Sequence, residues 1–166
     1  MSGQLRIEPA TETDVPLILS FIGKLAEYEK LSHLVVATEE NIREHVFGAN
    51  PVAEVLLAYW DEQPVGFALY FRNFSTFLGR AGIYLEDLFV EPEYRGKGIG
   101  KALLTRLAKI AVERKYGRLE WAVLDWNTPS IEFYRSLGAV PKDEWTTYQV
   151  TGDALSRLAV GDRRRA

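Results

Sequence analysis

The sequence predicts an α/β protein in which helices cover a mixed β-sheet. Two apolar segments, 52–60 and 65–72, are separated only by turn-forming residues, and this arrangement predicts a β-hairpin. Two further apolar segments, 83–90 and 119–124, alternate with segments of helical periodicity. A hairpin followed by alternating strands and helices indicates a sheet with both antiparallel and parallel neighbours.

The first two helices are predicted from their caps and from the spacing of their apolar residues. The first begins at Thr11 or Thr13, either of which can cap it, and runs to about residue 29. Its apolar residues recur at helical spacing: Val15, Ile18, Leu19, Ile22, Leu25 and Ala26. This helix therefore has one buried face. The second helix is capped by Thr38 and ends at Gly48.

The remaining elements follow from the same periodicities and from turn residues. We expect a strand at 5–8, a loop at 73–82, a helix at 99–115, a helix at 130–137, a last strand at 145–150 and a last helix near 153–159. The 166 residues suit a single domain, 1–166, with a charged, frayed tail at 161–166.

A glycine-rich segment, 95–100, joins the strand at 83–90 to the helix that follows it. Its glycines stand at alternate positions: Gly96, Gly98 and Gly100. Glycine allows unusual backbone angles and leaves room for a ligand. Free N–H groups at a helix start, with Arg95 and Lys97 nearby, favour a phosphate or pyrophosphate. The segment is not a Walker loop, because Ala102 stands where Ser or Thr would hold magnesium, and its spacing differs from the dinucleotide fingerprint.

The composition argues against several classes of function. A net charge of −3 argues against a nucleic-acid binder that relies on a basic surface. The absence of cysteine excludes disulfides, thiolate metal sites and an acyl-cysteine intermediate, and it fits a cytoplasmic protein. No apolar run approaches the roughly 20 residues that span a bilayer. His33 and His45 are expected at the surface, at helix ends, so we predict no metal site.

Two acidic residues, Glu86 and Asp87, interrupt the otherwise apolar strand at 83–90. Neighbouring residues of a regular strand point to opposite faces, so one carboxylate faces a core or a cleft. Acidic residues are costly to bury without a partner, so at least one of the two is expected to have a partner or a function. The alternative is an edge strand on which both carboxylates are solvated or form ion pairs.

The strand, the glycine spacing and the following helix together resemble the pyrophosphate loop of the GNAT superfamily of acetyl-CoA-dependent N-acetyltransferases. The predicted order, β-α-α-β-β-β-α-β-α-β, is that of the GNAT acyl-CoA N-acyltransferase fold, and the resemblance spans roughly residues 4–160. Four segments resemble the diamine (spermidine/spermine) N-acetyltransferase group: 6–11, 25–29, 84–90 and 126–134. The resemblance implies acetyl-CoA as cosubstrate, a small amine as acceptor and a homodimer with 145–150 near its interface.

The resemblance also implies roles for individual residues. Glu86 is the candidate proton acceptor, through water, and Tyr134 is the candidate acid for the thiolate leaving group, the alternative for Tyr134 being a packing aromatic. The implied cofactor-binding residues are Leu88, Phe89, Val90, Arg95, Gly96, Lys97, Gly98, Ile99, Gly100, Lys101, Asn127 and Tyr134. The implied substrate-binding residues are Tyr28, Glu29, Glu86, Asp87, Glu144 and Trp145. The run at 142–144 differs from the diamine group in spacing and charge.

The leading hypothesis is an N-acetyltransferase that transfers the acetyl group directly to a diamine or polyamine. An acidic channel would attract such a polycation, and its members would be Glu29, Glu86, Asp87 and Glu144. Another acceptor, such as thialysine or a lysine-like amino acid, would need a cation near its carboxylate, and the sequence does not identify one. Further alternatives are a non-catalytic acyl-CoA-binding module, a generic nucleotide-binding protein and a protein N-terminal acetyltransferase with a wider cleft.

Overall fold

The computed structural model describes residues 3–161, which form five strands and five α-helices. In chain order they are β1 (Leu5–Pro9), α1 (Val15–Tyr28), α2 (Glu39–Phe47), β2 (Glu54–Trp60), β3 (Gln63–Ser75), β4 (Arg80–Val90), α3 (Ile99–Glu113), β5 (Leu119–Trp121), α4 (Thr128–Ser136) and α5 (Gly152–Ala159). The chain divides into two compact units, one up to Leu124 and one from Asp125 onward. No helix within residues 3–161 is long and apolar enough to cross a membrane.

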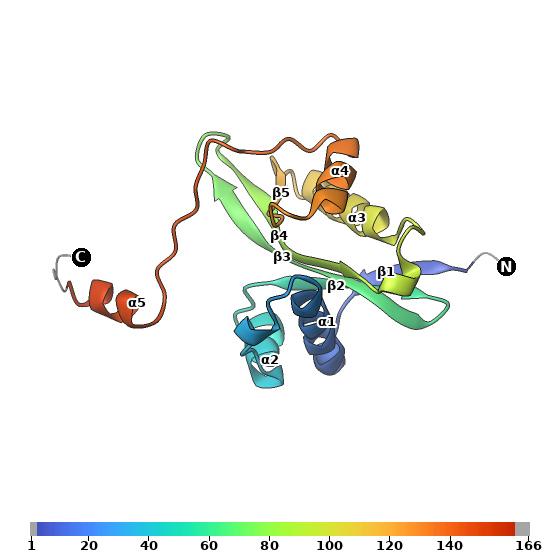
Figure 1. Ribbon diagram of the computed structural model, residues 1–166, viewed down its shortest axis with the longest axis horizontal. Helices are drawn as coiled ribbons and strands as arrows, with labels where there is room; N and C mark the ends of the chain where they lie inside the picture. The colour runs from blue at the N-terminus through green and yellow to red at the C-terminus, as the bar shows by residue number, and fades with distance from the viewer. Residues whose placement is uncertain (1–2, 162–166) are drawn as a thin grey trace. The chain divides into compact units, whose positions relative to one another are not determined.

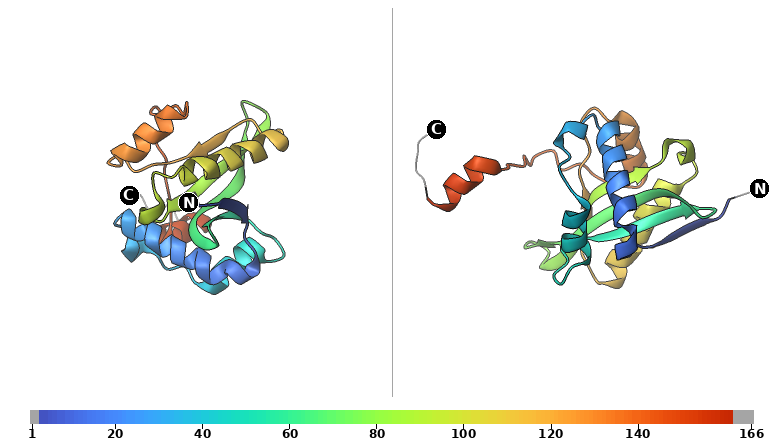
Figure 2. Two further views of the ribbon diagram at one scale, coloured as in Figure 1. Left: turned by 90° about the vertical axis from the view of Figure 1, so that its right-hand side faces the viewer. Right: turned by 90° about the horizontal axis from the view of Figure 1, so that it is seen from below.

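The first unit holds the whole sheet, whose strands lie in the order β1-β2-β3-β4-β5. The first four strands pair antiparallel, and β5 joins β4 in parallel, so the predicted mixed sheet is confirmed. Helices α1 and α2 lie on one face of the sheet and α3 on the other (Figures 1 and 2). The parallel pair requires a crossover, and α3 supplies it.

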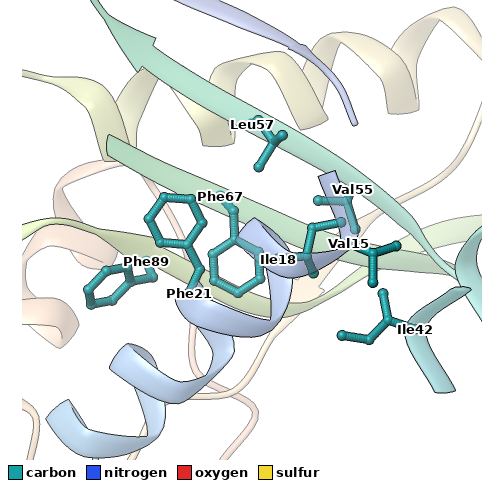
Figure 3. Packing of buried hydrophobic residues seen from close by; sticks show 8 residues of the cluster. All are labelled: Val15, Ile18, Phe21, Ile42, Val55, Leu57, Phe67 and Phe89. Carbon is teal, nitrogen blue, oxygen red and sulfur yellow. The ribbon is translucent and has the colours of Figure 1, made fainter. Parts of the chain in front are cut away.

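An aromatic cluster holds α1 against the sheet (Figure 3). The ring of Phe21 on α1 stacks on that of Phe67 on β3, with the ring centroids 5.5 Å apart. Phe89 on β4 lies beside Phe21 at 6.0 Å. Full burial of each such side chain contributes about 1.5–3 kcal/mol. The cluster therefore fixes the middle of α1 against β3 and β4.

Polar caps begin the first two helices. The Thr11 backbone N–H donates to Asp14 Oδ2 over 2.8 Å and opens the 3-10 turn Glu12–Asp14 that leads into α1. Thr11 therefore caps this 3-10 turn, whereas the N-cap of α1 itself is Asp14, so neither candidate threonine caps the α-helix. Thr38 caps α2 as predicted, because its Oγ1 accepts from the Asn41 N–H over 3.2 Å.

The prediction of a loop at 73–82 is wrong. Strands β3 and β4 continue through this region and pair as far as Ser75 and Arg80, leaving a turn at 76–79. The Ser75 hydroxyl accepts from the Leu78 N–H over 3.2 Å, and Gly79 takes a φ of 63° that favours glycine. A tight turn with its own hydrogen bond therefore replaces the longer loop.

The second unit corrects two further predictions. The expected strand at 145–150 is not a strand, and the side chains of Trp145 and Tyr148 are 68% and 91% exposed. Among residues 3–161 no strand pairs with this segment, so its backbone lacks the hydrogen bonds that define a strand. Helix α4 begins at Thr128 with Asn127 as its cap, two residues before the expected start, whereas α5 lies where the last helix was predicted.

Two smaller points concern the ends of elements. Strand β5 ends at Trp121 rather than at residue 124, because its ladder with β4 comprises three residue pairs. The tail predicted at 161–166 lies, except for Gly161, outside the described residues.

Candidate active site

A β-bulge at Glu86 determines how the acidic residues of β4 point. Leu69 of β3 pairs with Asp87, and the next residue, Tyr70, pairs with Leu85, so Glu86 is the extra residue. Asp87 therefore shares a face with Leu69, which packs against the cluster under α1. The two carboxylates are thus placed by the bulge and not by the regular alternation assumed from the sequence.

Three carboxylates gather between β4 and the end of α1. Asp87 is half-buried, and burial, followed by the like charges of Glu86 and Glu29, raises its pKa to about 6. Glu29 follows the last residue of α1, and burial raises its pKa as well. The Glu86 side chain is exposed. The expectation that one carboxylate of the pair faces the interior holds for Asp87, and the alternative of two solvated carboxylates does not.

The edge of β4 that faces β5 loses its strand partner at the bulge. The ladder between β4 and β5 ends at the pair Leu85–Trp121, and from Glu86 to Val90 this edge of β4 has no strand partner among residues 3–161. Alternate N–H groups along an unpaired edge are free to bind a ligand. Leu88, Phe89 and Val90, three of the implied cofactor-binding residues, all lie in this unpaired stretch. Strands β4 and β5 therefore separate beyond the pair Leu85–Trp121.

The glycine-rich segment forms an open loop at the start of α3. Gly96 and Gly98 have φ angles of 77° and 80°, and Gly98 is the N-cap of α3. No atom lies within 4 Å of where a Cβ would stand on either glycine, so the space beside the loop is open. Among the described residues, no hydrogen bond uses the backbone N–H groups of 96–98. Free N–H groups and the dipole of a 15-residue helix suit a pyrophosphate.

The other residues of this loop differ in their exposure. Ile99 is buried and anchors α3, Gly100 is half-buried, and Lys101 is exposed in the first helical turn. Lys97 is exposed, with its Nζ 5.4 Å from the Trp60 ring centroid. The cationic side chains near the loop therefore remain accessible to an anion.

The side chain of Arg95 turns toward α1. Its Nε donates to the Val90 carbonyl over 2.9 Å. Its guanidinium lies 4.7 Å from the Tyr28 ring centroid and 5.6 Å from that of Phe89. Lys24 forms an ion pair with Glu91 in the same region. The segment after β4 is thus joined to the end of α1 by two cationic side chains.

The second unit carries the other predicted site residues. Asn127 is buried, and its Oδ1 accepts from the Ser130 N–H over 3.4 Å, so it caps α4. Tyr134 is half-buried on α4, with its ring tilted against Phe133 at 5.6 Å. Glu144 and Trp145 are exposed. Their roles remain those implied by the resemblance.

Sequence reasoning missed three features of this site. The bulge depends on the pairing of β3 with β4, and no residue type marks it. The Arg95–Tyr28 and Lys24–Glu91 contacts join residues 67 positions apart, beyond the reach of local pattern. His33 and His45 are exposed, as predicted, and no group of three or more His, Cys, Asp or Glu side chains within residues 3–161 could hold a metal ion.

Comparison with known proteins places the chain among acetyltransferases. Residues 23–139 match the model of the acetyltransferase (GNAT) family. The chain is 42% identical to the thialysine N-epsilon-acetyltransferase of Sus scrofa, over 92% of this chain and 96% of that protein. It is 34% identical to the L-ornithine N5-acetyltransferase of Arabidopsis thaliana, over 92% of this chain and 87% of that protein.

Two further similarities bear on the diamine group and on the fold. The chain is 31% identical to a human spermidine/spermine N(1)-acetyltransferase-like protein, over 93% of this chain and 24% of that protein. An integron cassette protein from the mobile metagenome of V. cholerae has a similar structure, with a TM-score of 0.78 and 30% identity over 96% of this chain and 98% of that one. The predicted fold class and the resemblance to diamine-type N-acetyltransferases are confirmed.

Proposed function

This chain belongs to the acetyltransferase (GNAT) family and is an N-acetyltransferase, and we propose that it acetylates the terminal primary amine of a small, flexible alkylamine. The observation that carries this proposal is the group of three carboxylates, Glu29, Glu86 and Asp87, beside the unpaired edge of β4. Acetyltransferases of this family take the acetyl group from acetyl-CoA. A cationic amine and an acyl donor can therefore be held by adjacent parts of one strand.

Coulomb attraction recruits the amine. At 4 Å and an effective dielectric constant of 20, two unit charges attract by about 4 kcal/mol. Asp87 is the carboxylate best suited to hold an ammonium group, because the negative charges of both Glu86 and Glu29 act on it. A bound cation relieves the repulsion among the three carboxylates, so its binding also favours their ionised forms.

The bound ammonium has to lose a proton before its nitrogen can attack. An alkylammonium has a pKa of about 10.4, far above that of a carboxyl group, so desolvation and a water relay have to bring the two closer. We assign the acceptance of this proton to Glu86, through water, because its side chain is exposed at the bulge. Asp87 then holds the amine in position while Glu86 exchanges protons with solvent.

Backbone N–H groups would bind acetyl-CoA, the acetyl donor. Acetyl-CoA supplies an activated acetyl group, and the open loop at 96–100 is suited to its pyrophosphate. N–H groups on the unpaired edge at 88–90 would stabilise negative charge that develops on the carbonyl oxygen. Asn127 would contact the cofactor and Tyr134 would protonate the thiolate, both on the strength of the family resemblance.

The acceptor is either a diamine or polyamine, or a lysine-like amino acid. The acidic group favours any alkylammonium and so supports both. The names of the thialysine and ornithine relatives favour the amino acid, and that of the spermidine/spermine-like relative favours the polyamine. We also propose a homodimer in the cytoplasm, because the resemblance implies a dimer and a chain without cysteine suits a reducing compartment.

The test is the release of free CoA from acetyl-CoA in the presence of a panel of amines. The panel contains spermidine, spermine, putrescine, lysine, thialysine and a peptide with a free amino terminus. Turnover of the alkylamines, with little turnover of the peptide, supports the proposal. Binding of acetyl-CoA without turnover of any amine would favour a non-catalytic acyl-CoA-binding module. Preference for the peptide would point to a protein N-terminal acetyltransferase.

A further inference from the structure

A second polar cluster lies at the start of β5 and on the neighbouring strands, outside the acceptor site described above. The Arg118 Nε lies 2.9 Å from Glu120 Oε1, and the Asn73 Nδ2 donates to the same oxygen over 3.1 Å. The side chains of Arg118 and Glu120 are 28% and 24% exposed, so the ion pair is partly shielded from water. Gly82 leaves room for the cluster, because a Cβ there would lie 2.8 Å from both Arg118 Cγ and Asn73 Oδ1.

The hydrogen bonds of this cluster are incomplete. Within residues 3–161, two buried side-chain polar atoms lack a hydrogen-bond partner, Asn73 Oδ1 and Arg118 Nε, and both belong to it. The contact of Nε with Glu120 is thus an ion pair without hydrogen-bond alignment. Buried polar groups are rarely left unpaired in native proteins, and each costs about 1–3 kcal/mol. A ligand that draws these side chains into complete hydrogen bonds would recover part of that cost.

The strand register places the cluster on the same face of the sheet as Asp87. Asp87 pairs with residue 69 of β3, Tyr84 with 71 and Gly82 with 73, and alternate residues of β3 share a face. Tyr84 also pairs with Glu120 of β5. The Cα atoms of Asp87 and Glu120 are therefore about 8 Å apart, two ladder steps along β4 and one strand across. Burial, followed by the charges of Glu86 and Glu120, raises the pKa of Tyr84, so both carboxylates act on its hydroxyl.

We propose that Arg118 binds the α-carboxylate, and Glu120 the α-ammonium, of an amino acid whose side-chain ammonium is held by Asp87. This inference rests on the proposed function and goes further, because it names the residues that select the substrate class. The Arg118–Glu120 pair then favours diamino acids such as lysine, thialysine and ornithine. A diamine or polyamine has no carboxylate and would leave Arg118 without its ligand.

The dimensions fit such a substrate. The five bonds from the side-chain nitrogen of lysine to its α-carbon span about 6 Å when extended, and a hydrogen bond of about 2.8 Å at each end extends that reach. Asp87 and Glu120 can therefore hold the two ammonium groups of one molecule. Beside this path the half-buried rings of Phe71 and Tyr84 stack with their centroids 5.2 Å apart, and they offer an apolar surface to the methylene groups.

The chemistry of the Arg118–Glu120 pair matches the head group of an amino acid. A guanidinium presents its nitrogens in a planar fork that matches a carboxylate. The Arg118 Nη2 donates to the Phe74 carbonyl over 3.4 Å, whereas Nη1 forms no hydrogen bond within the part of the chain that the structure describes. A carboxylate has about four lone-pair sites, so Glu120 can accept from an ammonium as well as from Asn73. A zwitterion therefore suits the pair better than a dication does.

The experiment compares amines that differ only by the carboxylate. Lysine is paired with cadaverine and ornithine with putrescine, and kcat/KM is measured for each with saturating acetyl-CoA. We expect the wild-type protein to prefer the amino acid in each pair, and Arg118→Gln to reduce that preference by about 10- to 100-fold, the range of a charge-assisted hydrogen bond. Arg118→Lys keeps the charge without the fork, so part of the preference is expected to remain.

A control variant separates this role from a general loss of positive charge. Arg72→Gln removes a cation next to Asn73 on β3, whose side chain projects to the opposite face of the sheet and interacts electrostatically with Glu54. We expect the preference within each pair to be unchanged in this variant. An equal fall in kcat/KM for both members of each pair in Arg118→Gln would show that Arg118 serves the fold and would overturn the inference.

Two analogues of lysine test the wild-type protein directly. Lysinamide lacks the carboxylate charge and 6-aminohexanoate lacks the α-ammonium, so we expect the KM of each to exceed that of lysine by at least about 10-fold. KM values equal to that of lysine would overturn the inference, even if the Arg118 variants failed to fold. Acetylation of cadaverine and putrescine in preference to the amino acids would overturn it while leaving the proposed function intact. No acetylation of any amine would remove the proposed function and this inference together.

Discussion

Replacing Asp87 by asparagine is expected to stabilise the protein while impairing its activity. Burial and the like charges of Glu86 and Glu29 raise the pKa of Asp87 from 3.8 to about 6. The native state therefore holds this proton more tightly than the unfolded state does, and the free energy of unfolding falls as pH rises from about 4 to about 6. Well above pH 6, Asp87 is ionised in the native state, and its ionisation lowers the free energy of unfolding by the full amount.

The magnitude follows from the two pKa values. At 1.36 kcal/mol per pKa unit, the change from 3.8 to about 6 corresponds to a cost of up to about 3 kcal/mol at neutral pH. Asparagine has nearly the same shape and no charge, so Asp87→Asn removes that cost. A gain of 2 kcal/mol would raise the melting temperature by roughly 4–8 °C in a protein of this size.

The assay is urea unfolding of the ligand-free protein at pH 5, 6.5 and 8, with kcat/KM measured at each pH. We expect the stabilisation to be largest at pH 8 and to shrink toward pH 5, because Asp87 is protonated there in the wild-type protein. Activity should fall about 10- to 100-fold, since the ammonium loses a carboxylate partner. Glu86→Gln is the comparison variant: it removes the second cause of the raised pKa of Asp87 and leaves the first, burial, so it should stabilise the protein by less than Asp87→Asn does.

A loss of stability in Asp87→Asn that is the same at all three pH values would refute the reasoning. It would mean that the carboxylate makes favourable contacts in the native state that asparagine cannot replace. Stabilisation without loss of activity would refute the functional half alone and leave Asp87 as an unfavourable but inert residue.

Three further outcomes are expected. Tyr134→Phe should lower kcat about 100-fold with little change in the Kd of acetyl-CoA, and an unchanged kcat would remove Tyr134 from the mechanism. Glu86→Gln should lower kcat/KM and shift its pH profile, whereas wild-type behaviour at every pH would make Glu86 structural. Gly98→Ala should cost about 1–2 kcal/mol of stability and weaken acetyl-CoA binding in calorimetry, because φ is 80° there. Gly23→Ala, in the exposed interior of α1, should instead stabilise by about 1 kcal/mol, and a similar loss in both variants would argue against a special role for Gly98.

Features of the fold and of the site that depend on residues close together in the sequence could be predicted from the sequence. The glycine loop is such a feature, since Gly96 and Gly98 adopt angles that favour glycine. The hairpin of β2 and β3 is another, because turn residues separate two segments of strand-forming composition. The cap at Thr38 is a third, since its hydroxyl acts on a residue only three positions away.

Features that depend on partners distant in the chain could not be predicted. The segment 145–150 has the composition of a strand, yet a strand forms only where another supplies hydrogen bonds, and among the described residues none does. The orientation of Asp87 depends on which residue of β3 faces it. The direction of the Arg95 side chain depends on Tyr28, which precedes it by 67 residues.

The bulge at Glu86 accounts for both halves of the proposed site. A bulge turns the following residues to the other face and increases the local twist of the strand. This change of face places Asp87 on the side of the sheet that α1 covers, where Glu29 also lies. The added twist explains why the ladder with β5 ends at Leu85, directly before the bulge, and leaves the next five residues of that edge unpaired. The acceptor and donor sites thus depend on the same bulge. The bulge turns the Asp87 carboxylate inward, and burial of the aromatic cluster of Phe21, Phe67 and Phe89 offsets the free-energy cost of burying that carboxylate.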